Sequence, residues 1–286
     1  MNKIIEKISW VPFKIAYKYG KEAENPAKIN LRKIGINKEI TFYFPEKDVG
    51  LSKQLGTFGF REPINYEYYA NFLNEKDVVL DIGANIGLFT ILSSKANQII
   101  AVEPLPQAMP ILKKNIEANG IKDKTIILNL AVGKEKELLL EIDPQLNLSR
   151  IVKEKNEKTV SVKSVPVSYL TKKYGANVLR MDVEGYEYEI LLNEIPKEVN
   201  KISIEFHVQI LGKEKVEELM NYFEKEGFKI KYLVEDLPLR LYPLYSFLKK
   251  TGLIKLVTYV KKELTPTEAY PLLLKGRTIK YLFLER

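Results

Sequence analysis

The sequence predicts an α/β fold built on a doubly wound, seven-stranded sheet with an antiparallel edge strand. From about residue 77 onward, apolar runs of strand length alternate with helical patterns, which is typical of βαβ units. The last strand follows without a crossover helix, so we expect it to run antiparallel to its neighbours. The 286 residues are 45% hydrophobic and 10% aromatic, a composition that supports a packed core rather than disorder.

The strands are identified from apolar, β-branched runs bounded by turn residues. They are expected at residues 77–82, 98–103, 125–130, 177–182, 200–207, 227–234 and 278–285. Helices fit at residues 86–96, 106–119, 185–194 and 213–226. The last helix has the clearest pattern, because Val216, Leu219 and Phe223 recur at helical spacing and Gly227 ends it.

The segments outside this alternation define the predicted domain organisation. Residues 1–75, which are punctuated by Gly and Pro, should form an N-terminal extension packed on the core. Residues 76–286 should form the main domain, with insertions at about 131–176 and 235–277. The first insertion has two short strands around a polar Lys/Glu stretch, and the second is rich in Leu, Tyr, Pro and Lys.

The composition restricts the available chemistry. The absence of cysteine excludes disulfides, thiolate metal sites and cysteine nucleophiles. His207 is the single histidine, which excludes sites that need two. No run of eighteen apolar residues occurs, so no transmembrane helix is expected. Glu6 and Lys7 stand where a signal peptide needs its apolar stretch, so we expect a cytoplasmic location.

The net charge of +8 is concentrated at the two ends of the chain. Residues 1–21 carry a net charge of +4 and residues 229–286 carry +7, which leaves the middle mildly acidic. Such ends favour an anionic partner, namely lipid headgroups, nucleic acid or a phosphorylated substrate. A lysine-rich solubilising surface is the alternative.

Residues 240–264 are expected to form two short helices separated at Pro243 and Gly252. In the second helix, one face would carry Leu253, Leu256, Val257, Val260 and Leu264. Such a helix either contacts an anionic membrane surface, here the inner face of the membrane, or packs as a lid over the active-site mouth. Contact with RNA through phosphates and stacking is a third, less favoured interpretation.

A glycine turn follows the first strand and opens a helix. It reads Asp81-Ile82-Gly83-Ala84-Asn85-Ile86-Gly87, and Glu103 ends the next strand. In βαβ units such a turn brings a ligand close to the backbone, and an acid at the second strand end binds ribose hydroxyls. Asn85 stands where a pyrophosphate requires glycine, so a dinucleotide fits poorly. A phosphate-free cofactor with an ammonium group to pair with Asp81 fits better, which favours S-adenosylmethionine. The alternative is a turn that only permits tight packing.

Five segments resemble the FkbM-type family of class I S-adenosylmethionine-dependent methyltransferases. They are DIGANIGLFT (81–90), AVEP (101–104), NLAVG (129–133), RMDVEGYE (180–187) and ISIEFH (202–207). The resemblance covers roughly residues 60–210 and implies a Rossmann-like methyltransferase sheet that often serves O-methylation of sugars and other hydroxyls. It also implies a set of cofactor-binding residues: Asp81, Gly83, Ala84, Asn85, Gly87, Glu103 and Pro104, with Ala131 against the adenine.

Acidic residues gather at the ends of the fourth and fifth strands, where ligands of open α/β sheets bind. Asp182 and Glu184 follow the fourth strand, and His207 closes the fifth. An alcohol needs its proton removed as it is methylated, so these three residues are the candidates for catalysis. Glu187 and Glu205 are interpreted as structural or solvated. Asp182 could instead cap a helix, and His207 could make a structural hydrogen bond.

A divalent cation on Asp182, Glu184 and His207 is conceivable, but the spacing does not demand one, and no metal is expected. The sequence therefore predicts an S-adenosylmethionine-dependent methyltransferase that O-methylates a sugar, a glycan or a lipid-linked glycan. Its acceptor would be a hydroxylated glycan or small molecule. The alternatives are an RNA methyltransferase, which the missing Asn/Asp-Pro-Pro-aromatic motif disfavours, and a non-catalytic cofactor-binding scaffold. An NAD-linked oxidoreductase is disfavoured by Asn85.

Overall fold

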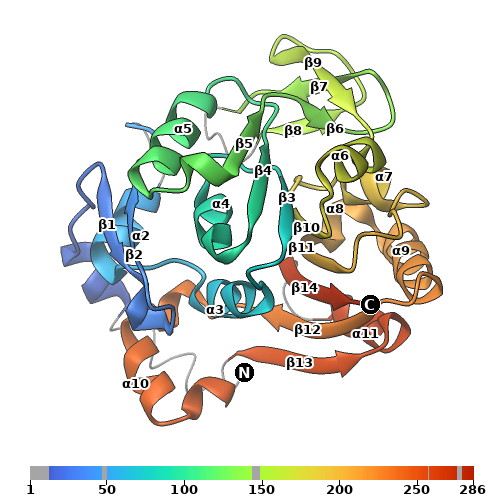
Figure 1. The fold of residues 1–286 in the computed structure, drawn as a ribbon. Helices are drawn as coiled ribbons and strands as arrows, with labels where there is room; N and C mark the ends of the chain where they lie inside the picture. The colour runs from blue at the N-terminus through green and yellow to red at the C-terminus, as the bar shows by residue number, and fades with distance from the viewer. Residues whose placement is uncertain (1–12, 47–49, 144–148, 257, 276–278) are drawn as a thin grey trace.

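The computed structural model describes residues 13–46, 50–143, 149–256, 258–275 and 279–286. At its centre lies a mixed eight-stranded sheet in the order β13-β12-β14-β11-β10-β3-β4-β5 (Figure 1). The strands are β3 (Val78–Ile82), β4 (Gln98–Val102), β5 (Thr125–Leu128), β10 (Val178–Met181), β11 (Lys201–His207), β12 (Lys229–Glu235), β13 (Tyr259–Leu264) and β14 (Ile279–Glu285). The five neighbouring strands β11, β10, β3, β4 and β5 run parallel to one another. Strand β14 lies between β11 and β12 and runs antiparallel to both. The seven predicted strands are present, and the doubly wound α/β class is confirmed.

The eighth strand, β13, occupies a stretch that was expected to be an amphipathic helix. The structure has a short 3₁₀ helix, η6 (Leu253–Leu256), after which β13 pairs antiparallel with β12. The predicted helix is therefore wrong for this stretch; Val257 lies outside the described residues. The open edge of β12 offers unpaired backbone donors and acceptors, and pairing with them outweighs a helical spacing of apolar residues. The preceding piece is helical as predicted, with η5 (Leu239–Leu244) and α10 (Tyr245–Lys250).

Helices cover both faces of the sheet, and each face has its own apolar core. Val79 of β3 belongs to the core that includes α3 (Pro63–Phe72), α4 (Leu88–Leu92) and α5 (Met109–Ala118). Leu80 belongs to the opposite core. That core takes in α6 (Val167–Tyr174), α7 (Glu187–Leu191), α9 (Lys213–Lys225) and α11 (Pro266–Leu273). The four predicted helices are present but shorter than expected, and no helix within the described ranges is a candidate membrane span.

Several short elements complete the helical set. They are η2 (Ser93–Lys95), η3 (Lys122–Lys124) and α8 (Val208–Leu211), and residues 13–19 are also helical. The helix α6 was not predicted. Its first turn follows Pro166 and begins with Val and Ser, which have weaker helix propensity than the Ala, Leu or Glu that mark a helix in a sequence.

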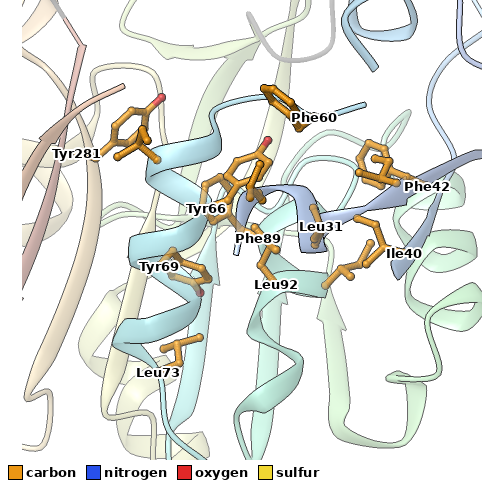
Figure 2. Packing of buried hydrophobic residues seen from close by; sticks show 14 of the residues in the cluster. Leu31, Ile40, Phe42, Phe60, Tyr66, Tyr69, Leu73, Phe89, Leu92 and Tyr281 are labelled. Atoms are coloured by element: carbon orange, nitrogen blue, oxygen red, sulfur yellow. The ribbon is translucent and has the colours of Figure 1, made fainter. Parts of the chain in front are cut away.

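The N-terminal residues pack against the helix that follows the glycine turn. They form β1 (Ala27–Asn30), η1 (Leu31–Ile34), β2 (Glu39–Phe42) and α2 (Leu51–Phe58). Figure 2 shows their apolar side chains beside Phe89 and Leu92 of α4. Tyr66 and Tyr69 of α3 meet the Phe89 ring edge-on, with ring centroids 5.5 Å and 5.1 Å away. This cluster fixes α4, and with it the turn that precedes α4.

The first insertion forms a separate four-stranded sheet in the order β6-β9-β7-β8. Its strands are β6 (Ala131–Val132), β7 (Glu137–Glu141), β8 (Arg150–Val152) and β9 (Thr159–Val165). Strands β7 and β9 were predicted, whereas β8 was not. In Figure 1 this small sheet lies beyond the carboxyl end of β5, so the insertion borders the edge of the main sheet where ligands are expected.

Candidate functional site

The glycine turn after β3 has a backbone that side chains would disturb. Gly83, Asn85 and Gly87 have φ values of 76°, 50° and 91°, in the left-handed region. A Cβ atom added to Gly83 would lie 1.9 Å from the carbonyl oxygen of Asp182. At Gly87, it would lie 2.6 Å from Leu112 Cδ1. Tight packing alone therefore accounts for both glycines. Only the cavity beside the turn indicates a role in ligand binding.

Glu103 lies directly beside this turn and ties it to the second strand. Its side chain is buried, and its two carboxylate oxygens accept hydrogen bonds from the backbone N–H groups of Asn85 and Leu105, both at 2.8 Å. A carboxylate has about four acceptor positions, so roughly two remain for a ligand. Burial raises the pKa of Glu103 to about 7, against the lowering effect of the two backbone hydrogen bonds.

A cavity of about 270 Å³ lies at the carboxyl ends of β3, β4, β10 and β11. Its wall contains six of the eight predicted cofactor-binding residues: Gly83, Ala84, Asn85, Glu103, Pro104 and Ala131. Asp81 and Gly87 are not part of the wall. The turn, the second-strand acid and the small-sheet residue Ala131 thus meet around one space, as the sequence pattern suggested.

Asp81 lies behind the wall and has protein partners of its own. It is fully buried, accepts a hydrogen bond from the Thr90 hydroxyl at 2.6 Å and pairs with Arg180 at 3.3 Å. Burial raises the pKa of Asp81, while Arg180 and Thr90 oppose that rise. The expected pairing of Asp81 with a cofactor ammonium group finds no support in this position, because a guanidinium already balances the carboxylate.

Arg180 begins the RMDVEGYE segment, but the sequence pattern assigned it no role in the site. Its side chain is 5% exposed, it donates to the carbonyl oxygen of Gly83 at 3.0 Å, and its second terminal nitrogen lies 3.2 Å from Asp182. Its guanidinium also lies 3.9 Å from the centroid of the Phe89 ring. Arg180 therefore connects the glycine turn, Asp81 and the acceptor side of the cavity.

The three predicted residues for catalysis lie together, but they differ in their access to the cavity. Asp182 and Glu184 are in its wall, whereas His207 is buried behind them. The Nε2 atom of His207 lies 3.4 Å from Glu184, and its Nδ1 atom lies 2.6 Å from Glu187. Glu187 is fully buried, not solvated. Glu205, which was interpreted as structural or solvated, is part of the cavity wall.

The titration of these groups reflects burial among like charges. Burial raises the pKa of Glu184 to about 7; the Asp182 carboxylate adds to the rise, and His207 opposes it. Burial lowers the pKa of His207, but its hydrogen bond to Glu187 and the negative charges of Glu187, Asp182 and Glu184 together outweigh this, so the net shift is upward. A carboxylate with a pKa near neutrality suits proton transfer at physiological pH.

Residues from outside the recognised motifs complete the wall. Arg61 and Glu62, which precede α3, form an ion pair at 2.7 Å, and Arg150 comes from β8 of the small sheet. Their place in the cavity wall could not be predicted from the sequence, because only the packing of the N-terminal segment and of the insertion brings them there.

Comparison with known proteins gives one family match. The model of the family described as Methyltransferase FkbM domain matches residues 81–230. A search of curated proteins gives no match.

Several solved structures are similar at low sequence identity. A protein of the NADB-Rossmann superfamily from Streptococcus agalactiae is 12% identical with a TM-score of 0.41, over 85% of this chain and 71% of that one. A precorrin-6y C5,15-methyltransferase from Geobacter metallireducens GS-15 is 10% identical with a TM-score of 0.42, over 86% and 93%. A tRNA m1G37 methyltransferase from M. jannaschii is 16% identical with a TM-score of 0.41, over 87% and 54%.

Proposed function

The chain belongs to the FkbM methyltransferase domain family and is an S-adenosylmethionine-dependent methyltransferase, and from this premise we propose that it O-methylates a hydroxyl group of a sugar, a glycan or a lipid-linked glycan. One observation carries the proposal. Glu184, a carboxylate whose pKa is raised to about 7, stands in the wall of the same cavity as the glycine turn and Glu103. A hydroxyl acceptor is the class of substrate that needs such a base.

The cavity residues fit the cofactor that the family implies. Glu103 keeps about two acceptor positions, which is enough for two ribose hydroxyls. Pro104 and Ala131 add apolar wall for an adenine ring. Carboxylates outnumber guanidiniums in the wall, with Glu62, Glu103, Asp182, Glu184 and Glu205 against Arg61, Arg150 and Arg180. Burial raises the pKa of Glu103 and Glu184 to about 7 and that of Glu205 well above its usual range, so a cationic ligand would favour the ionised forms of these groups.

In the proposed reaction the protein positions the acceptor and manages its proton. S-adenosylmethionine, when bound, supplies a methyl group on a cationic sulfonium that leaves as a neutral thioether. Glu184 accepts the proton of the acceptor hydroxyl while the oxygen forms its new bond to carbon. His207 lies within 3.4 Å of Glu184 and restrains its carboxylate. Arg180 holds Asp182 in the wall, so the acceptor meets a fixed set of side chains.

Calorimetry with Glu103→Ala tests the cofactor assignment. The wild-type protein should bind S-adenosylmethionine and not NAD, and the variant should lose about 1–3 kcal/mol of binding free energy because the ribose hydroxyls lose a charged acceptor. The exposed Glu214→Gln on α9 serves as the control and should leave the affinity unchanged. Binding of NAD alone, or equal affinity in Glu103→Ala, would contradict the assignment.

The basic ends also support a proposal, namely contact with an anionic membrane that would suit a lipid-linked acceptor. Exposed apolar side chains lie among lysines at both ends: Tyr19 is 72% and Phe247 59% exposed. The rings of Phe13 and Phe58, 6.4 Å apart, and of Phe58 and Tyr242, 5.4 Å apart, connect the N-terminal helix to η5, which directly precedes α10. The two basic segments therefore lie on neighbouring parts of the surface.

Co-sedimentation separates the anionic partners. We expect binding to vesicles that contain phosphatidylserine, weakening as salt rises, and little binding to vesicles of phosphatidylcholine alone. Phe247→Ala should weaken the vesicle binding because it removes an exposed apolar contact. Salt-sensitive binding to RNA without vesicle binding would favour the RNA alternative instead.

A further inference from the structure

We propose that Asp182, Glu205 and His207 form a binding site for one divalent cation of the Mg²⁺ or Mn²⁺ class, beside the position of the methyl acceptor. The role of this cation rests on the proposed function, whereas its binding does not. One ligand atom from each residue lies within 4.8 Å of the other two. Ligand atoms that share a cation at about 2.1–2.5 Å lie up to roughly 4–5 Å apart, so small side-chain movements would complete the site.

His207 is held in the way that metal-binding histidines are held. Its side chain is 6% exposed, and Nδ1 lies 2.6 Å from the carboxylate of Glu187, which is fully buried. A proton on Nδ1 then leaves the lone pair of Nε2 free on the cavity side of the ring. Carboxylates that orient a histidine through its other nitrogen are the usual second layer of a metal site.

The atoms around Nε2 favour a cation between them. Nε2 lies 3.4 Å from Glu184 and 3.9 Å from Glu205, so a neutral ring would turn its lone pair toward two carboxylates. That arrangement is repulsive unless a proton or a metal ion lies between the groups. The surroundings of Nε2 therefore favour a positive charge, either a proton or a bound cation, between His207 and the two carboxyl groups.

Among the described residues, one carboxylate oxygen of the proposed site is buried without a hydrogen-bond donor. Within the described ranges, Oδ1 of Asp182 is buried and has no hydrogen-bond partner. The other oxygen of Asp182 is taken by Arg180 at 3.2 Å. Glu205 is 15% exposed, and one of its carboxylate oxygens lies 3.9 Å from Nε2 of His207. Buried carboxylate oxygens without donors are costly, and a bound cation removes that cost.

Oxygen-rich ligand sets with one imidazole suit hard divalent cations better than soft ones. In the proposed reaction the cation would hold the acceptor oxygen and lower the pKa of its hydroxyl group. Glu184 lies in the same wall but outside the proposed ligand set, so it remains available to accept the proton.

Titration of the full-length protein with Mn²⁺ alone, followed by calorimetry and by electron paramagnetic resonance, tests the proposal. We expect one saturable site per chain. Glu205→Gln should weaken it at least about tenfold, and Glu187→Gln, which disturbs the group that orients His207 and accepts from the backbone N–H of Gly185, about 10–100-fold. The exposed Glu214→Gln should bind like wild type. Circular dichroism checks that each variant folds.

The outcomes separate the cation site from the proposed function. Absence of saturable Mn²⁺ binding, or equal binding by wild type and Glu205→Gln, overturns the site, and a proton then accounts for the charge at His207. Methyl transfer that is undiminished by EDTA in the same preparation would contradict the role of the cation in the reaction and leave the proposed function standing. Mn²⁺ binding that depends on Glu205, without methyl transfer to any hydroxyl acceptor, supports the site and contradicts the function.

Discussion

Replacing Arg180 with alanine should lower the free energy of unfolding by about 3–5 kcal/mol, because it leaves the Asp81 carboxylate buried without a counter-charge. Asp81 is fully inaccessible to solvent, and within the described residues its partners are Arg180 and the Thr90 hydroxyl. The substitution also removes the hydrogen bond to the carbonyl oxygen of Gly83. Urea denaturation followed by circular dichroism measures the loss.

Two variants make this expectation specific. Arg32→Ala removes an exposed arginine and should change the free energy of unfolding by less than about 0.5 kcal/mol. The double variant Asp81→Leu with Arg180→Met removes both charges at similar volume and should recover most of the loss. A decrease below about 1 kcal/mol in Arg180→Ala would mean that Asp81 is neutral in the folded protein.

The burial and pairing of Arg180 could have been predicted from the sequence. A charged residue inside the apolar run of the fourth strand needs a buried partner. In the doubly wound order that strand lies beside the first, and the structure pairs Arg180 with Asp81 in register. The partner was therefore available to sequence reasoning. Asp81 was assigned to the cofactor instead, because its own motif was considered without the neighbouring strand.

The central strands were predictable because their signal is local. Strands β3 and β4 are short, mainly apolar runs that are buried on both faces, so burial alone marks them in the sequence. Strand β13 has no such signal, since it depends on an edge supplied by β12, about thirty residues earlier in the sequence. Contacts that depend on distant partners override local periodicity.

The same distinction applies to the cavity. Gly83 and Glu103 were identified because the turn and the strand end impose residue types at fixed spacing. Arg61 and Arg150 reach the wall from the N-terminal segment and from β8, and no spacing rule connects them to the motifs. Glu205 was taken as structural because its position within a strand shows alternation but not which face meets a cavity.

Glu184→Gln should have the largest effect on turnover, lowering kcat about 10²–10⁴-fold while leaving the affinity for S-adenosylmethionine nearly unchanged. The amide keeps the size of the side chain but cannot accept the hydroxyl proton. In the wild type, the base is the ionised form of a carboxyl whose pKa is raised to about 7. Its ionised fraction grows as pH rises through that value, so kcat/KM should rise from pH 6 to about 8 and then level off.

The pH profile of the variant shows whether the fall in kcat results from losing the base at Glu184. Glu184→Gln should lose the rise near pH 7 as well as the rate, whereas a substitution that only disturbs packing would lower the rate and keep the profile. Asp182→Asn and His207→Ala should also reduce turnover, because Asp182 shares the wall and His207 contacts Glu184. A Glu184→Gln enzyme within about threefold of wild type would exclude Glu184 as the base.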